Sequence, residues 1–463
     1  MTLNGKALWR LSKVSSKKTC TSMKTQQTYT LGPFIVLIFI YFIVGFLTTV
    51  NGQCQAPLKI AFLDNAGELK NTFITLISFF FFLAYLLNGT LGGKWINAYG
   101  YKKTLLRALG IMVAGLMVFF FSSWFTVNYP DYYVRIASAQ IPYGYFMFLC
   151  GSYLMGTSAT LLQVVINPYV AAYDVPGTQP VQRMNIVCAF NSFGTTIAPF
   201  FVTGVMFRGV PIEEVHVRQL MFPFILLATF IALTAFITQR LSLPDLQGTK
   251  TSGDETLERS IWSFRHLKLG VVAIFFYVGA EVSIGVNINL HAQELELSGQ
   301  GLSFLGNKHL MLWGYDLGIP ALLATLYWGG LMVGRIISSM ITNISPRIQL
   351  TVTTVLATVF AVVGILTHNL WVLVAIGLFH SVMWGCIFTL AIKGLKKYTS
   401  KASGVFMMGV FGGAVFPVIQ GALADLFGSW QWTWILVIIC ELVMLYYALW
   451  GSRIKESELL DTN

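Results

Sequence analysis

The chain has 463 residues, of which 56% are hydrophobic and only 11% are charged, and its mean hydropathy is +0.69. A soluble domain carries about 25% charged residues, so this composition excludes a soluble globular protein and a disordered chain. The net charge of +11 does not indicate nucleic-acid binding, because few charges interrupt the hydrophobic runs. The remaining class is a protein that crosses a lipid bilayer many times.

Twelve stretches are long and apolar enough to cross a bilayer as helices, which takes about 20 residues each. They lie at 32–52, 72–93, 104–125, 136–171, 184–207, 219–240, 269–290, 317–342, 349–367, 370–394, 403–427 and 431–452. The fourth is long enough for a helix and a reentrant or amphipathic end. We therefore predict an all-α membrane protein with a basic tail (1–30), two six-helix bundles (31–240 and 269–452), a linker between them (241–268) and a C-terminal tail (453–463).

The distribution of basic residues predicts the orientation. With the N-terminus in the cytoplasm, 24 of the 30 lysine and arginine residues fall on the cytoplasmic side, as the positive-inside rule requires. Both termini are then cytoplasmic. A chain of six plus six spans with a charged linker is typical of the major facilitator architecture, in which substrate binds near the bilayer midplane between the two halves.

Two glycine-rich stretches are followed by basic residues. One ends the second span and leads to Lys102 and Lys103, and the other lies in the eighth span and ends at Arg335. Glycines let helices approach closely, and the basic side chains fix the cytoplasmic ends of the helices. We expect a structural or gating role for these three residues.

Ionisable groups inside a spanning helix are costly and are candidates for function. Glu281 lies in the middle of the seventh span among small residues that leave room on its face, and we expect it to be functional. Glu441 lies in the twelfth span, which is peripheral in this architecture, so packing or a contact with lipid is the favoured interpretation. Asp425 is expected to cap a helix end, and His380 is the one histidine embedded in a predicted span.

Neutral polar side chains concentrate in the first, fourth, fifth and seventh spans. The amides expected to contact substrate are Asn51, Gln163, Asn167, Asn191 and Asn287. Amides offer a sugar both donors and acceptors without adding charge. In the tenth span, His380 and Trp384 begin a stripe of rings at every fourth residue, which suits either helix packing or the apolar face of a sugar.

The sequence contains no nucleophile elbow, P-loop or zinc-protease motif. We therefore expect no enzymatic activity, no cofactor and no metal site. Without a P-loop, transport would be driven by an ion or solute gradient.

Six longer motifs can be compared with known families. They are Gln163-Val-Val-Ile-Asn-Pro-Tyr-Val170, Ala189-Phe-Asn-Ser-Phe-Gly-Thr-Thr-Ile-Ala-Pro199, Tyr277-Val-Gly-Ala-Glu-Val-Ser-Ile-Gly285, Tyr327-Trp-Gly-Gly-Leu-Met-Val-Gly-Arg335, Gly377-Leu-Phe-His-Ser-Val-Met-Trp-Gly-Cys-Ile-Phe388 and Gly412-Gly-Ala-Val-Phe-Pro-Val-Ile-Gln-Gly-Ala-Leu-Ala-Asp425. Over about residues 31–450 they resemble the fucose–galactose–glucose:proton symporter family of the major facilitator superfamily, and in particular its glucose/galactose branch.

The resemblance implies substrate contacts for Gln163, Asn167 and Asn191, with Glu281 lining the C-terminal side of the cavity. The chain also departs from the family pattern. The carboxylate usual in the first helix is replaced by Gly52, the glutamate of the fucose branch by Gln163, and an asparagine of the tenth helix by His380. These departures leave both the coupling ion and the sugar open.

We interpret the chain as a monomeric importer of a hexose of the glucose, galactose and fructose class in the inner membrane, working by alternating access. Proton coupling would run through Glu281, paired with His380. A sodium-coupled carrier, a uniporter and a permease for amino sugars or cell-wall fragments are alternatives. An anionic sugar is disfavoured because no arginine lies in the middle of a span. A membrane sensor or enzyme is the remote alternative, since neither an added domain nor a nucleophile–base cluster is present.

Overall fold

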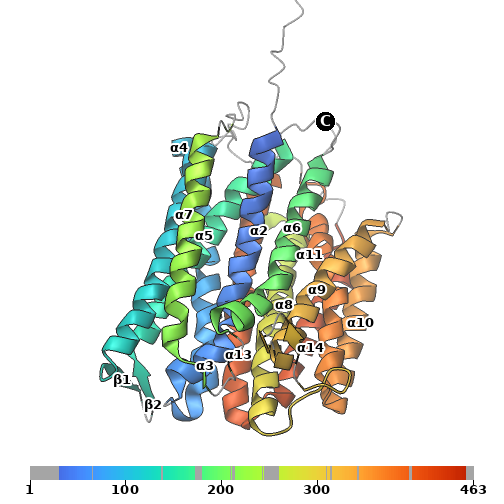
Figure 1. Ribbon diagram of the computed structural model, residues 1–463. Coiled ribbons are helices and arrows are strands. Elements are labelled where there is room, and N and C mark those ends of the chain that lie inside the picture. The colour runs from blue at the N-terminus through green and yellow to red at the C-terminus, as the bar shows by residue number, and fades with distance from the viewer. Residues whose placement is uncertain are drawn as a thin grey trace, which may run out of the picture.

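The computed structural model of the chain is almost entirely helical (Figure 1). It describes residues 31–64, 66–136, 139–172, 180–208, 210, 214–241, 243, 260–308, 310–312, 315–316, 318–340, 344–395 and 399–454. Within these residues, 12 helical segments are long and apolar enough to cross a membrane. The prediction of an all-α protein with twelve spans is therefore confirmed. The predicted tail at 1–30, most of the linker and the last nine residues lie outside the described residues.

The N-terminal half supplies six of the spans. Its elements are α2 (Leu31–Gln53), α3 (Gln55–Leu63), the short helix η1 (Gly67–Leu69), α4 (Lys70–Asn128), strands β1 (Tyr133–Ile136) and β2 (Ala139–Pro142), α5 (Tyr143–Ala172), α6 (Pro180–Phe200) with its π-helical end η2 (Phe201–Met206), η4 (Val217–Leu220) and α7 (Met221–Arg240). Strands β1 and β2 form an antiparallel hairpin with Tyr133 opposite Pro142.

The C-terminal half supplies the other six spans. Its elements are η5 (Ile261–Ser263), α8 (Arg265–Leu297), strands β3 (Met311–Leu312) and β4 (Tyr315–Asp316), α9 (Gly318–Met340), α10 (Pro346–Thr367), α11 (Leu370–Ile392), α12 (Thr399–Met408), η7 (Gly409–Phe411), α13 (Gly412–Phe427), η8 (Gln431–Trp434), α14 (Ile435–Tyr446) and its π-helical end η9 (Tyr447–Gly451).

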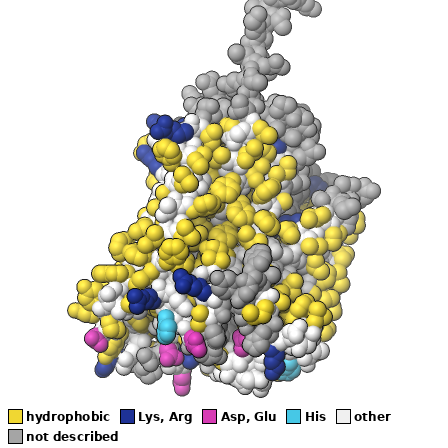
Figure 2. Space-filling model, viewed as in Figure 1, with side chains coloured by type: hydrophobic (Ala, Val, Ile, Leu, Met, Phe, Trp, Pro, Cys, Tyr) yellow, Lys and Arg dark blue, Asp and Glu magenta, His cyan; other side chains and the backbone are white. Residues whose placement is uncertain are grey.

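The helices run between two opposite ends of the molecule. We call the end where α2 begins the terminal face, and the end with the β1–β2 hairpin the hairpin face (Figure 1). Figure 2 shows a broad band of apolar side chains between these ends, and in that view the acidic side chains gather toward the hairpin face. Outer helices keep large apolar side chains exposed, such as Phe222 at 65% and Leu366 at 69%. A surface of this kind is stable in contact with lipid.

Two predicted spans are joined in a single element. The stretches at 72–93 and 104–125 both lie in α4, which is interrupted only at Gly100, where φ is 79° and ψ is 170°. Glycine adopts a positive φ without steric cost because it lacks a Cβ. The chain therefore reverses direction at Gly100 without a long loop.

Three predicted spans differ from the structure at one end. The stretch at 136–171 begins in the hairpin, so its first residues are strand and its helix starts at Tyr143. The stretch at 269–290 is longer than predicted, because α8 continues as helix to Leu297. The stretch at 403–427 is divided between α12 and α13, with a tight turn of helix at Gly409–Phe411. A Cβ on Gly412 would lie 1.7 Å from the backbone oxygen of Phe275, so this close approach to α8 requires glycine.

One set of contacts between the two halves lies on the side of the hairpin face. Gln53 of α2 donates to the Gly285 carbonyl of α8 at 2.7 Å and accepts from Asn289 at 2.8 Å. Gln293 of α8 donates to the Ala56 carbonyl of α3 at 3.0 Å. These bonds are buried, and they hold α2, α3 and α8 together at this end.

The carboxylate of Asp425 makes the second contact between the halves. It lies at the end of α13 and accepts from the backbone N–H groups of Asn71 and Thr72 at 3.1 and 2.7 Å. A negative charge at the first turn of a helix satisfies free N–H groups and complements the helix dipole. Asp425 therefore caps a helix, as predicted, but the helix is α4 in the other half.

Candidate functional site

A cleft between the two halves forms the first part of the site. Its walls come from α2, α4, α8 and α9, and its lining residues are Thr48, Thr49, Asn51, Gly52, Ser78, Phe81, Phe82, Val282, Val286 and Trp328. We call it the central cleft. Two polar atoms of its wall, Asn51 Oδ1 and Trp328 Nε1, are buried without a hydrogen-bond partner among the described residues. Since a buried polar group without a partner is costly, this acceptor and this donor are suited to a ligand hydroxyl.

Three of the predicted amides lie together in the N-terminal half, around two tyrosines. Gln163 of α5 donates to the Tyr85 hydroxyl of α4 at 2.8 Å. Asn191 of α6 donates to the Tyr41 carbonyl of α2 at 2.9 Å, and Asn167 hydrogen-bonds the Tyr41 side chain. None of these amides is part of the central-cleft wall. Each has a protein partner within the bundle, but Asn167 Oδ1 is buried without a hydrogen-bond partner among the described residues.

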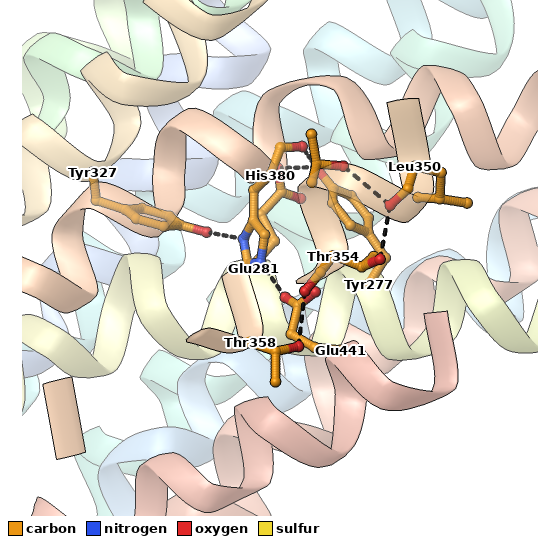
Figure 3. Close-up of polar contacts among 9 residues, drawn as sticks. Tyr277, Glu281, Tyr327, Leu350, Thr354, Thr358, His380 and Glu441 are labelled. Atoms are coloured by element: carbon orange, nitrogen blue, oxygen red, sulfur yellow. Dashed lines mark hydrogen bonds and ion pairs between the residues drawn. The ribbon is translucent and has the colours of Figure 1, made fainter. Parts of the chain in front are cut away.

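The C-terminal half holds a chain of polar contacts that we call the buried network (Figure 3). It consists of Tyr277, Glu281, Tyr327, His380 and Glu441. The Tyr277 hydroxyl lies 2.8 Å from Glu281 Oε1 and 3.0 Å from the His380 carbonyl. The Tyr327 hydroxyl lies 2.7 Å from His380 Nδ1, and His380 Nε2 lies 2.6 Å from Glu441 Oε1. Glu281 is half-buried, whereas His380 and Glu441 are fully buried.

Helix geometry explains why these residues meet. Glu281 is the central residue of α8, with Tyr277 one turn before it on the same face. His380 lies near the middle of α11, and Glu441 lies near the middle of the span that contains α14. All three ionisable residues therefore stand at similar depth, although they belong to different spans.

The guanidinium group of Arg335 joins the two halves near this depth. Arg335 of α9 donates to the Ser192 hydroxyl of α6, and its charge interacts with Glu281 and with Tyr41. Arg335 belongs to the last third of α9 and not to its middle. Its side chain nevertheless contacts the other half, so a positive charge lies between the halves.

Other residues expected at the site have different contacts. Asn287 bonds Gln420 of α13 at 2.9 Å and is fully buried between α8 and α13. Trp384 is half-buried with its ring packed on Phe406 and Tyr277, which favours the packing interpretation of the aromatic stripe.

The two predicted gating lysines lie at the terminal face. Lys102 donates to the carbonyls of Gln239 and Leu241 at 2.9 and 2.7 Å, where it satisfies the C-terminal end of α7. Lys103 is exposed. Their positions fit a structural role at the helix ends.

Sequence reasoning missed two features of the site. Glu441 was assigned to packing or to lipid, but it is fully buried and contacts His380, which had been paired with Glu281. A carboxylate and a histidine in the middle of two spans were the signal that could have suggested this pair. The buried N–H of Trp328 left no signal in the sequence.

The fold and the polar site between its halves define a membrane transport protein. A family model described as Major Facilitator Superfamily matches residues 34–416. The chain belongs to this superfamily.

Relatives with assigned names agree with the resemblance seen in the motifs. The chain is 32% identical over 423 residues to a glucose/galactose transporter of Brucella abortus, covering 90% of this chain and 93% of the relative. It is 29% identical to a putative glucose/galactose transporter of Helicobacter pylori, covering 94% and 99% of the two chains. It is 23% identical to the L-fucose-proton symporter of Escherichia coli, covering 91% and 93%.

Solved structures show the same fold. A crystal structure of the E. coli fucose:proton symporter matches with a TM-score of 0.60 and 20% identity, covering 91% of this chain and 98% of that one. A D-xylose-proton symporter matches with a TM-score of 0.64 and 14% identity, covering 92% and 100%.

Proposed function

We propose that the protein is a monomeric secondary transporter that imports a hexose of the glucose and galactose class together with a proton, without chemical change to the sugar. The terminal face is cytoplasmic in this proposal, because most lysines and arginines fall on that side. The membrane is the inner membrane of the cell. The observation that carries the proposal is a cleft lined by both halves, with two unpartnered polar atoms in its wall, next to a network of ionisable groups in the C-terminal half. The names of the relatives support the sugar class.

The wall of the central cleft suits a sugar. Asn51 Oδ1 can accept a hydrogen bond and Trp328 Nε1 can donate one, and both lack a protein partner. A sugar hydroxyl does both at once. Phe81 and Phe82 supply apolar surface beside these polar atoms, as the C–H faces of a hexose require. Gln163 bonds Tyr85, whose ring stacks on Phe82 of the cleft wall, and we expect Gln163 and Asn191 to join the sugar when the halves move.

Alternating access follows from the contacts between the halves. In this structure the hairpin face is closed by the bonds of Gln53, Gln293 and Asp425. With the hairpin face taken as the outer side, this state is closed to the outside, and outward opening requires these bonds to break. Each is a neutral or capping bond with a modest net free energy of about 1 kcal/mol, so the two states can interconvert.

Proton coupling is assigned to Glu281. A carboxyl group in a spanning helix can take up and release a proton, and the charge of Arg335 interacts with its ionised form. Protonation of Glu281 removes its attraction for Arg335, which also contacts Ser192 in the other half. The protonation state of Glu281 is therefore linked to a contact between the halves.

Uptake by the purified protein in liposomes tests the proposed function. Radiolabelled glucose, galactose, fructose, mannose and fucose are offered at two pH values, with and without sodium. An amino sugar and an acidic sugar are included, the latter because Arg335 lies between the halves. We expect accumulation of a neutral hexose that depends on the pH gradient and not on sodium. If only the charged sugars accumulate, or none of the sugars does, the hexose assignment is wrong.

Lys59 of α3 gives a pH-dependent prediction for the hairpin face. Burial lowers the pKa of Lys59 from 10.5 to about 8, although Glu294 and Asp425 nearby act in the opposite direction. In the outward-open state water reaches this lysine, so the closed state binds the proton more weakly. A rise in pH from about 8 to about 10 is therefore expected to favour closure of the hairpin face.

Spin labels on two exposed hairpin-face positions, Glu68→Cys and Ser298→Cys, measure that closure as a distance distribution. The closed fraction should rise over this pH range in the parent protein and stay high throughout in Lys59→Met. Opening of the hairpin face as the pH is raised, in the protein with Lys59, would contradict the prediction.

A further inference from the structure

The contact between His380 and Glu441 is unusual for a structural ion pair in a membrane protein. Both side chains are 0% exposed, and their nearest atoms are 2.6 Å apart. Taking two ionisable groups out of water costs several kcal/mol per ion, and inside a bilayer such groups are retained mainly where they act. Glu441 lies on α14, which contributes no residue to the wall of the central cleft. Substrate binding therefore does not explain this carboxylate.

The pair can hold or lose one proton without moving. With the proton, the Glu441 carboxyl group is neutral and donates to His380 Nε2, while Nδ1–H donates to the Tyr327 oxygen. Without it, Nε2–H donates to the ionised Glu441 carboxylate, while the Tyr327 hydroxyl donates to Nδ1. The distances of 2.6 and 2.7 Å fit both states. A group that needs no rearrangement on protonation is well suited to exchange.

One oxygen of Glu441 also lacks a donor. Glu441 Oε2 is buried with no hydrogen-bond partner among the described residues. Thr354 and Thr358 of α10 lie beside it (Figure 3), but their hydroxyls donate to the carbonyls of Leu350 and Thr354 at 2.7 and 2.8 Å. A permanently ionised carboxylate would gain from a donor at this place. The surroundings are therefore suited to a carboxyl group that is ionised only part of the time.

The ionisable neighbours connect the pair to Glu281. On α8 they are Tyr277, which packs on the His380 ring, and Glu281, whose charge interacts with His380. On α9 they are Tyr327 and Arg335. On α14 itself, Cys440 adjoins Glu441, and α10 presents only threonines. The route from the pair toward the cleft thus passes hydroxyl groups and ends at the half-buried carboxylate of Glu281.

We propose that His380 and Glu441 together hold an exchangeable proton that is bound and released in each transport cycle, as a second protonation site beside Glu281. The inference deepens the proposed proton coupling and rests on it. On release, Glu441 passes its carboxyl proton to His380 Nε2, and Nδ1 gives its proton to the Tyr327 oxygen. Tyr327 releases its own hydroxyl proton toward Glu281, with whose charge it interacts, and then donates to Nδ1. The pair changes from net neutral to one negative charge, and no covalent bond other than these N–H and O–H bonds changes.

Infrared difference spectroscopy of the purified protein in lipid discs tests the inference. A change from acid to alkaline buffer, without sugar, reports the carboxyl groups that lose a proton. The wild type should show two such bands. Glu441→Gln should remove one band and Glu281→Gln the other, while Glu68→Gln, a change on the exposed surface, should remove neither. His380→Gln should shift the titration midpoint of the Glu441 band by at least one pH unit to the alkaline side, because the imidazole nitrogen that takes up the carboxyl proton is gone.

Sugar addition at constant pH then tests whether the site takes part in transport. The Glu441 band should change in intensity when sugar binds, and Glu441→Gln should keep sugar exchange while the pH dependence of that exchange becomes flatter. A spectrum of Glu441→Gln equal to that of the wild type overturns the inference, and so does a Glu441 band that sugar leaves unchanged. If Glu441→Gln does not fold, the titration midpoint of the Glu441 band in His380→Gln tests the inference instead, and an unchanged midpoint overturns it. Failure of the wild type to bind any hexose would instead refute the proposed function, since the pH experiment needs no sugar.

Discussion

Glu281→Gln is expected to abolish uphill accumulation of sugar while leaving sugar exchange across the membrane active. In the structure the Tyr277 hydroxyl lies 2.8 Å from Glu281 Oε1. Glutamine has the size of glutamate, and its side-chain oxygen can still accept this hydrogen bond. Glutamine cannot take up a proton. With one proton per sugar, a pH difference of one unit is worth about 1.4 kcal/mol, or about tenfold accumulation. The variant should reach an inside-to-outside ratio of one.

The measurement uses radiolabelled sugar in liposomes with an imposed pH gradient, followed by counterflow at equal pH. Glu68→Gln makes the same chemical change on the exposed hairpin face and should accumulate sugar like the wild type. Tenfold accumulation by Glu281→Gln would mean that the proton is carried elsewhere.

Removal of the two unpartnered polar atoms of the central cleft is expected to weaken sugar binding strongly. Trp328→Phe removes the Nε1–H donor and keeps an aromatic ring, and Asn51→Ala removes the Oδ1 acceptor. Each lost hydrogen bond to the sugar is worth about 1 to 1.5 kcal/mol, which raises Kd roughly tenfold. The double variant should approach a hundredfold if the two bonds act independently.

Calorimetric titration of the hexose into purified protein measures these changes. Trp262→Phe is the matched control, because Trp262 lies in η5, is 45% exposed and is outside the cleft wall. The control should bind sugar with unchanged Kd. An unchanged Kd in Trp328→Phe and Asn51→Ala would show that sugar binds at another place.

Much of the fold was predictable because a bilayer imposes a length and a polarity on each spanning helix. The predicted span boundaries are wrong at helix ends, where the bilayer no longer determines length and polarity. The predicted fourth span begins at residue 136, yet the structure has strands β1 and β2 up to Pro142 and the helix starts only at Tyr143. Residues 291–297 are polar, yet they extend α8 because Asn289 and Gln293 bond the other half. Hydropathy cannot distinguish these cases, which depend on contacts distant in the sequence.

The candidate site was predictable only in part. Glu281 and His380 stood out because ionisable groups are costly in the membrane, and the structure brings them into one network. The partner of His380 was not predictable, since a carboxylate in a span looks the same whether its face meets lipid or α8 and α10. Asn287 was expected to contact substrate, but its amide bonds Gln420 between two helices of the same half.

The most direct measurement of sugar–proton symport follows the pH of a weakly buffered suspension of proteoliposomes when hexose is added outside. Coupled import predicts that the medium becomes more alkaline as sugar enters, with one proton per sugar, and that Glu281→Gln gives no such change. Sugar entry without any change in external pH would contradict coupling, and no sugar entry at all would contradict the transport of hexose.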